Sequence, residues 1–437
     1  MNLKYSLFET IHQFCLDHGI EKNYWIAFSG GLDSQVLLHL FAEVRSVLPL
    51  SLRVIHVNHG LNSQADQWVL QCEQRCRELN INFITKKISI QLNKGESLEN
   101  AAREARYAVF SEFIKDDDII VTAHHQDDQA ETMLLQLLRG AGLKGLAAMP
   151  TIKLFAKGFL ARPLLNYTRD ELKNYAEQNK LSWIEDDSNA SQNFTRNFLR
   201  QEIFPLLKKR WPNVAEVFSR SALHCAEAQA MLGVIVEKEL ASIQGSQPNT
   251  LSVKKLLQQG LAQQKYLIRA WLGQQGFSLP ATVKMKHILQ DMLHAGADKQ
   301  PMVAWPGVEL RRYRDDLFAM LPLTDHDAGQ VLVWDLNNPL SIQGVGILAA
   351  RPVQGSGLNP TLVKNVTVCF RQGGEVGGHH ALKKYFQEWG ILPWLRDRVP
   401  LIFVDGELAA VPGRWIARKY AVAGHESGVE FVIFKSS

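Results

Sequence analysis

The chain has 437 residues, a formal net charge of +4 and 46% hydrophobic residues, so it is long enough for two or three hydrophobic cores. The mildly basic charge allows a polyanionic partner without requiring one. The five cysteines include no C-x-x-C pair, no apolar run approaches membrane-spanning length, and the amino-terminal region lacks a signal-peptide core, so we expect a cytoplasmic protein without a disulfide framework or a membrane partner.

The first distinctive feature is a tight turn between a predicted strand at 24–28 and a predicted helix whose apolar residues begin at Val36. The first N–H groups of a helix lack partners and lie at the positive end of its dipole, so such a turn suits an anion. Two adjacent glycines let the backbone approach a phosphate closely. The turn consists of Ser29, Gly30, Gly31, Leu32, Asp33 and Ser34.

Asp33 is the unexpected member of this turn. A carboxylate beside a phosphate is repulsive unless a cation lies between them, so Asp33 indicates either bound Mg²⁺ or a chemical role. The alternative is that Asp33 and Ser34 only cap the helix. The usual nucleotide P-loop is excluded, because no lysine occurs between Lys22 and Lys86.

Further strands and helices alternate along the next hundred residues. This alternation predicts an α/β fold with a doubly wound parallel sheet and right-handed crossovers. The expected strands are 51–60, 81–90 and 119–123, and the expected helices are 63–79 and 99–113.

Polar clusters at 56–59 and 124–128 also follow predicted strands. Ligands in such sheets bind beyond the carboxyl ends of the strands, so we expect both clusters to converge with the turn at 29–34. The second cluster has the residue types of a transition-metal site. Its polar members are His124, His125, Gln126, Asp127 and Asp128.

Glu99, Arg103 and Arg106 are spaced to share one helix face. They form either an exposed ion-pair ladder or a set of substrate contacts, and the spacing alone leaves both open. Cys72 and Cys76 lie one helical turn apart, and without further cysteines nearby an ordinary helix face is the favoured interpretation.

The remaining chain predicts two more domains. Residues 204–323 are predominantly helical in pattern, and 324–437 alternate short apolar runs with turns, as in a small α+β module, so the first domain spans 1–203. Three basic clusters next to an aromatic residue suit contacts with nucleic acid, although each alone is also typical of a solvated face. They lie at 208–211, 311–314 and 383–385.

The turn SGGLDS resembles the SGGxDS pattern of the PP-loop ATP pyrophosphatases. A longer ordered set of motifs resembles the tRNA(Ile)-lysidine synthases of the long bacterial form. Asn62 departs from the family pattern, which often has arginine there. The matching motifs are SGGLDS, HVNHGLN, E-x-x-x-R-x-x-R-Y, AHHQDDQAET, RPLL, IEDDSN and TRNFLR, followed by RQGGE, LKKYFQEWGILPWLRDRVPLIF and AAVPG.

This resemblance implies that ATP adenylates the wobble cytidine of tRNA(Ile) with a CAU anticodon, and that free L-lysine then displaces AMP to give lysidine, which changes decoding from Met to Ile. It implies that residues 29–34 bind ATP, that Asp33 and Asp127 hold Mg²⁺, and that Asp33 and Asp128 are catalytic, with Asp128 as the base. The implied substrate contacts are Glu99, Arg103 and Arg196.

Two alternatives stand beside this interpretation. A tRNA 2-thiolase would share the PP-loop but commonly needs paired cysteines, for which Cys72 and Cys76 are poorly spaced. A non-catalytic tRNA-binding protein with a relic nucleotide pocket would be expected to have lost carboxylates that this chain retains. The sequence leaves the oligomeric state open, a homodimer included.

Overall fold

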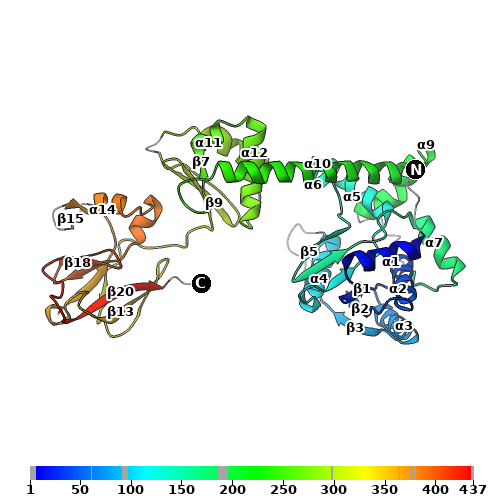
Figure 1. The fold of residues 1–437 in the computed structure, drawn as a ribbon, viewed down its shortest axis with the longest axis horizontal. Helices are drawn as coiled ribbons and strands as arrows, with labels where there is room; N and C mark the ends of the chain where they lie inside the picture. The colour runs from blue at the N-terminus through cyan, green and yellow to red at the C-terminus, as the bar shows by residue number, and fades with distance from the viewer. Residues whose placement is uncertain are drawn as a thin grey trace. The chain divides into compact units, whose positions relative to one another are not determined.

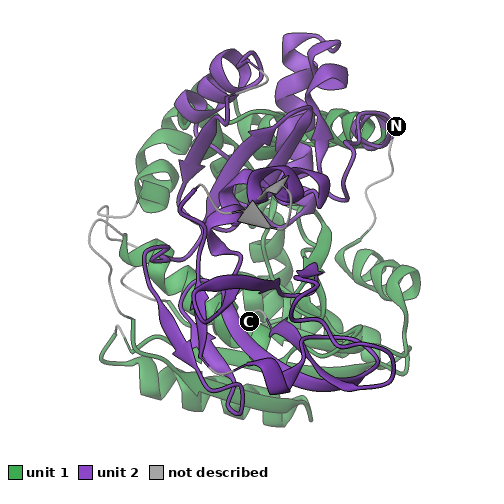
Figure 2. Ribbon diagram, turned by 90° about the vertical axis from the view of Figure 1, so that its left-hand side faces the viewer, with its two compact units in different colours: residues 1–234 green, residues 235–437 purple. Residues whose placement is uncertain are grey.

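The computed structural model describes residues 6–60, 62–90, 97–185, 195–296, 299–363, 365–373, 376–377 and 380–434. It divides into two compact units, Met1–Val234 and Ile235–Ser437 (Figure 2). Their boundary falls within the long helix α10 (Val214–Ser242). The expected division into three domains, 1–203, 204–323 and 324–437, is finer than these two units and stays a prediction. The motifs IEDDSN and RQGGE extend outside the described residues.

The first unit contains a six-stranded sheet in the order β3-β2-β1-β4-β6-β5. Five of these strands run parallel, and β5 pairs antiparallel with β6 at one edge. The predicted α/β fold with a parallel sheet is therefore confirmed. The strands are β1 (Asn23–Ala27), β2 (Ser51–Asn58), β3 (Asn82–Lys87), β4 (Ile119–Val121), β5 (Ile152–Phe155) and β6 (Gly158–Ala161).

Hydrophobic cores cover both faces of this sheet, because successive side chains of a strand point to opposite faces. Tyr24 and Ile26 of β1 pack in a core with helices α1, α2, α3 and α7, whereas Trp25 packs with Val109 and Phe110 of α4. Figure 1 shows these helices around the sheet. They are α1 (Leu7–His18), α2 (Leu32–Arg45), α3 (Ala65–Glu78), α4 (Leu98–Phe113) and α7 (Arg169–Gln178).

Two further helical segments of the first unit pack against each other, one after β4 and one that begins at residue 195. Helix α5 (Gln126–Leu138) begins directly after the 124–125 histidine pair, and the short helix α6 (Leu143–Leu146) follows it. Ala130 of α5 packs against Leu199 and Phe204 in a small core. The second segment consists of α8 (Thr195–Phe198), the π-helical turn η2 (Leu199–Ile203) and α9 (Phe204–Arg210), which leads into α10.

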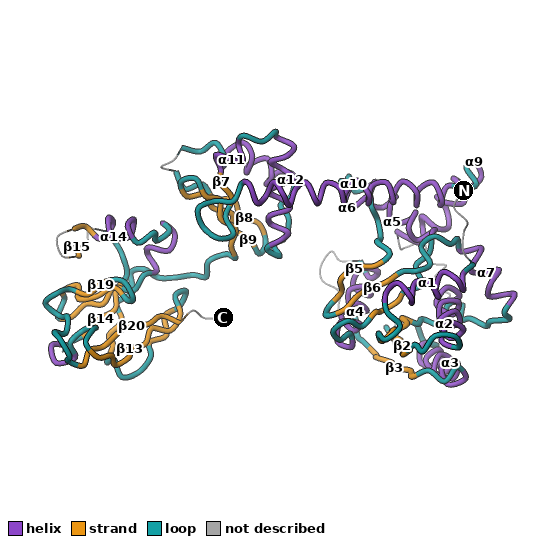
Figure 3. Tube along the Cα trace, viewed as in Figure 1, coloured by secondary structure: helices purple, strands orange, loops and turns teal. Residues whose placement is uncertain are grey.

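The second unit begins with helices, as expected, but also contains a four-stranded antiparallel sheet in the order β7-β10-β9-β8, which was not predicted from the sequence. Figure 3 shows strands and helices together in this region. Its elements are β7 (Leu251–Ser252), α11 (Val253–Leu257), α12 (Leu261–Gln274), α13 (Thr282–His287), η3 (Ile288–Met292), β8 (Met302–Trp305), β9 (Val308–Tyr313) and β10 (Asp316–Met320).

The carboxy-terminal part is an α+β module, as predicted. A five-stranded sheet, β11-β14-β17-β18-β19, and a three-stranded sheet, β12-β13-β20, contribute to one core. Within the described ranges, no helix is long and apolar enough to cross a membrane. The elements are β11 (Leu332–Trp334), β12 (Leu340–Ile342), β13 (Gly346–Gln354), η4 (Pro360–Leu362), β14 (Val366–Cys369), β15 (Val376–Gly377), β16 (His380–Ala381), α14 (Leu382–Glu388), η5 (Pro393–Arg398), β17 (Leu401–Val404), β18 (Glu407–Val411), β19 (Trp415–Ile416) and β20 (Ser427–Phe434).

Candidate active site

The turn at 29–34 joins β1 to α2 at the carboxyl end of the central strand. Its two serines close the turn, because the hydroxyl groups of Ser29 and Ser34 lie 3.1 Å apart and Ser34 Oγ donates to the carbonyl of Gly31 at 2.9 Å. Gly31 is the residue immediately before α2, with an extended backbone. The loop therefore presents the amino-terminal end of a fourteen-residue helix, as an anion site requires.

Gly30 is the most constrained position of the loop. Its φ is +85°, in the region that favours glycine. A Cβ added there would lie 2.5 Å from Ile184 Cδ1 and 2.9 Å from Cys72 Sγ. The amide of Ile184 also donates to the Gly30 carbonyl at 2.9 Å. Cys72 thus packs beneath the loop, and burial raises the pKa of its thiol to about 12, which leaves it unreactive.

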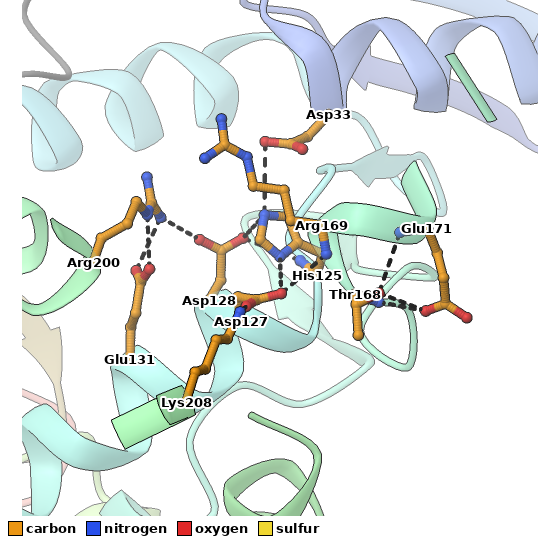
Figure 4. A network of polar contacts seen from close by, with 10 residues as sticks. All are labelled: Asp33, His125, Asp127, Asp128, Glu131, Thr168, Arg169, Glu171, Arg200 and Lys208. Carbon is orange, nitrogen blue, oxygen red and sulfur yellow. Dashed lines mark hydrogen bonds and ion pairs between the residues drawn. The ribbon is translucent and has the colours of Figure 1, made fainter. Parts of the chain in front are cut away.

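His125 lies between three carboxylates (Figure 4). Its Nε2 atom is 3.7 Å from Asp33 and 3.4 Å from Asp128, and its Nδ1 atom is 3.7 Å from Asp127. Burial disfavours the charged ring, but Asp128, Asp33 and Asp127 raise the pKa of His125 to about 9. These contacts confirm that the turn and the 124–128 cluster converge.

Glu131 and Arg200 complete this network, although neither was predicted from the sequence to have a role. Arg200 donates from Nε and Nη2 to the two oxygens of Glu131, at 2.8 and 3.0 Å, and from Nη2 to Asp128 at 3.1 Å. Glu131 is one helical turn beyond Asp128 on α5, so helical spacing could have indicated that both face the same site. Burial raises the pKa of Glu131.

The two expected magnesium ligands lie on opposite edges of the His125 ring. Asp33 faces Nε2 together with Asp128, whereas Asp127 faces Nδ1. Asp33 Oδ1 is buried and has no hydrogen-bond partner among the described residues, which suits a cation ligand. No set of three or more His, Cys, Asp or Glu side chains in the described part of the chain could hold a metal alone. Mg²⁺ does not require such a set, because it is commonly bound by one or two carboxylates together with substrate phosphates.

The other expected substrate residues surround the same region from α4 and α8. Arg196 lies 3.5 Å from Glu99 and donates to Thr132 at 3.2 Å, so the structure brings two of the three predicted contacts together. Arg103 instead donates to Tyr107 of its own helix at 3.4 Å and stacks on that ring. Glu99, Arg103 and Arg106 are therefore not a simple ion-pair ladder.

His59 follows β2 and contacts the same helix. Nε of Arg106 donates to Nε2 of His59 at 3.3 Å, which requires a neutral ring because only that form can accept. Burial and the charge of Arg106 lower the pKa of His59 to about 4. An unfolded histidine has a pKa of about 6.5. The unfolded chain therefore binds more protons than the folded chain between these two values.

We expect acidification from about pH 6.5 to about pH 4 to lower the free energy of unfolding through His59. One proton corresponds to at most about 1.4 kcal/mol per pH unit. His59→Gln keeps an acceptor for Arg106 but cannot titrate, so this variant should lose that part of the slope. Urea unfolding at several pH values measures both slopes, and equal slopes for the two proteins would contradict the assignment.

Three domain families and several curated relatives match most of the chain. Residues 5–207 match the PP-loop domain, 251–318 the TilS substrate binding domain and 366–433 the TilS substrate C-terminal domain. A relative from Coxiella burnetii is 43% identical, over 96% of this chain and 95% of its own length. A relative from Methylococcus capsulatus is 41% identical, over 92% of this chain and 93% of its own length. A relative from Alkalilimnicola ehrlichii is 39% identical, over 94% of each chain. All three are named tRNA(Ile)-lysidine synthase.

Proposed function

This chain belongs to the tRNA(Ile)-lysidine synthase family, and from that premise we propose how its residues carry out the reaction. The chain is an ATP-using ligase that forms lysidine in tRNA. The thiolase alternative is not favoured, because the relatives that match nearly the whole chain are named tRNA(Ile)-lysidine synthase and both TilS domains match. In agreement, Cys72 and Cys76 are buried, and burial raises the pKa of their thiols to about 12. We further propose free L-lysine as the amine substrate and the cytoplasm, where tRNA is modified, as the compartment.

The proposed reaction has two steps. The C2 oxygen of the wobble cytidine, in a tRNA(Ile) with a CAU anticodon, attacks the α-phosphorus of ATP and forms an O–P bond as the bond to the β-phosphate oxygen breaks. Pyrophosphate leaves with its electron pair. The ε-amine of lysine then forms a C–N bond at C2, and AMP leaves with the former C2 oxygen. Lysine arrives with its ε-amine protonated, so a protein carboxylate accepts one proton before the attack. The nitrogen gives up a second proton to the departing AMP phosphate or to water as the C–N bond forms.

We propose that residues 29–34 hold the departing pyrophosphate. The α2 amino terminus and the closed pair of Ser29 and Ser34 support this assignment, because they direct N–H and O–H groups and the positive helix end toward one place. For Mg²⁺ we favour Asp33 and Asp128, since they share one edge of His125 and Asp33 Oδ1 lacks a partner in the described ranges. The ion would neutralise phosphate charge there.

The environments of the carboxylates suggest different roles in the second step. Burial opposes the charge of Asp128, but His125, His124 and Arg200 lower its pKa to about 2, so Asp128 stays ionised and can hold a cation. Burial raises the pKa of Glu131, which makes it the better proton acceptor. We therefore propose Glu131 in place of Asp128 as the base, with Asp128 holding the lysine ammonium or the metal.

Positive charge on the other side of the site suits the anionic reactants. The pKa of His124 is lowered to about 3, mainly because the ring is buried. Asp128 opposes this shift, whereas the nearby charges of Arg162, Arg103 and Arg196 add to it. We propose that Arg103 and Arg196 neutralise charge on the adenylated intermediate and that Glu99 orients Arg196. Exposed Lys383 and Lys384 of α14 remain candidates for tRNA phosphate contacts.

The observation that carries this proposal is the position of His125 between the turn at 29–34 and the carboxylates of α5. The ring lies 3.7 Å from Asp33 and 3.4 Å from Asp128, and Arg200 joins Asp128 to Glu131. The test is incubation with ATP, labelled lysine and tRNA(Ile) bearing CAU. Lysine-dependent AMP release and label in the tRNA are expected, whereas a transcript with uridine at the wobble position should give neither. Loss of both signals with the CAU substrate would refute the proposal.

A further inference from the structure

Asp127 is the carboxylate of the network that faces away from the ATP turn, and it joins three helices (Figure 4). It belongs to the first turn of α5, where its Oδ2 atom accepts from the backbone amide of Arg169, the first residue of α7, at 3.0 Å. Its Oδ1 atom accepts from Lys208 of α9 at 2.9 Å. Both oxygens are thus engaged by protein groups.

His125 lies on the inner side of this junction. Its Nδ1 edge is 3.7 Å from Asp127, too long for a hydrogen bond but close enough for attraction, and its Nε2 edge faces Asp33 and Asp128. A continuous series of polar side chains therefore runs from Lys208 through Asp127 and His125 to the two carboxylates beside the ATP turn. Replacing Asp127 removes the carboxylate from one edge of the ring and leaves the other edge facing Asp33 and Asp128.

Lys208 lies at the outer end, on the helix that leads into α10. The Lys208 side chain is 42% exposed and that of Asp127 is 18% exposed, so the pair resembles a surface ion pair, which contributes at most about 1 kcal/mol to folding. Lys208 belongs to the basic cluster at 208–211, one of three considered for nucleic-acid contact. Its observed partner is a carboxylate of the candidate active site instead.

We propose that Asp127 and Lys208 are positioning residues that fix the His125 ring, and with it the Asp33 and Asp128 carboxylates, relative to the helix α9 that leads toward the substrate-binding domain. Neither residue touches the reacting atoms. This inference rests on the proposed lysidine-forming reaction. It predicts that the pair affects the rate of the chemical steps and leaves the binding of ATP and tRNA nearly unchanged.

The experiment compares Asp127→Asn, Lys208→Met and the double variant in the full-length protein. Each single variant should lower kcat for lysidine formation about tenfold, with KM for ATP and Kd for tRNA within about twofold of wild type. The double variant should fall no further than the more affected single variant, because both substitutions break the same connection. Thermal unfolding midpoints should stay close to wild type.

Lys209→Met is the matched control, because Lys209 is the exposed neighbour on the same helix and should keep wild-type kcat. The inference is overturned if Lys208→Met equals Lys209→Met in kcat, or if the two single effects multiply in the double variant. It is also overturned if Lys208→Met mainly weakens tRNA binding in a salt-dependent manner, which would identify a phosphate contact. An inactive wild-type protein would instead contradict the proposed function.

Discussion

Replacing Asp33 with asparagine should lower kcat for lysidine formation by at least about a thousandfold, or about 4 kcal/mol of transition-state stabilisation. The substitution keeps the size of the side chain but removes the negative charge that faces His125. It also replaces one carboxylate oxygen with an NH2 group, which cannot bind a cation, beside a buried oxygen that has no partner among the described residues. Rapid-quench measurement of AMP formation with saturating ATP, lysine and tRNA gives the rate directly.

Asp66→Asn is the matched control for this substitution. Asp66 is the second residue of α3, as Asp33 is of α2, but its carboxylate contacts Asn58 and Lys87. We expect near wild-type turnover in the control and unchanged tRNA affinity in both variants. Turnover within tenfold of wild type in Asp33→Asn would remove Asp33 from the mechanism.

Gly30→Ala should abolish ATP-dependent AMP release and also destabilise the fold. The φ of +85° is unfavourable for alanine, and the new Cβ would overlap Ile184 and Cys72. Strain and overpacking together predict a loss of about 2–4 kcal/mol in the free energy of unfolding. Chemical denaturation and the AMP assay measure the two effects separately.

Gly31→Ala tests whether this effect is specific to Gly30. The nearest atom to a Cβ on Gly31 would be Ser29 Oγ at 3.6 Å, which is an ordinary van der Waals contact. Gly31 also has an extended backbone, which alanine adopts freely. The free energy of unfolding of this variant should therefore remain within about 0.5 kcal/mol of wild type. Equal destabilisation by the two alanines would show that the contact with Ile184 does not constrain the turn.

The catalytic unit was largely predictable because its strands are short apolar runs and its polar clusters follow them. Tyr24 and Ile119 are paired in adjacent parallel strands, as the alternation of strands and helices predicted. That topology alone brought Asp33 and His125, far apart in sequence, into one prediction. The partner of each side chain was not predictable from the sequence. Asp128 shares the Nε2 edge of His125 with Asp33, whereas Asp127 faces Nδ1, and this arrangement depends on how the His125 ring is oriented in the folded chain.

The basic clusters illustrate where local composition fails. Arg311 pairs with Glu309 at 2.8 Å and stacks on Trp394, far along the chain. Arg312 donates to three backbone carbonyls at the end of η3, those of Met292, Leu293 and Ala295. A run of arginines beside a tyrosine serves RNA binding or internal structure equally well, and only distant contacts distinguish the two.

The β7–β10 sheet was missed for a related reason. Its hairpin strands β9 and β10 include arginine and aspartate residues, so they do not resemble the apolar runs of the parallel sheet. The burial of Leu310 and Leu317 comes from the helices that pack on the sheet, and this packing involves residues distant in sequence.

In the proposed reaction, ATP activates the cytidine base and not the carboxylate of lysine. The most direct measurement uses tRNA(Ile) with an oxygen-18 label at C2 of the wobble cytidine and analyses the AMP produced in a single turnover by mass spectrometry. The proposed mechanism predicts that AMP carries the heavy oxygen. Unlabelled AMP formed together with lysidine would contradict adenylation at the C2 oxygen.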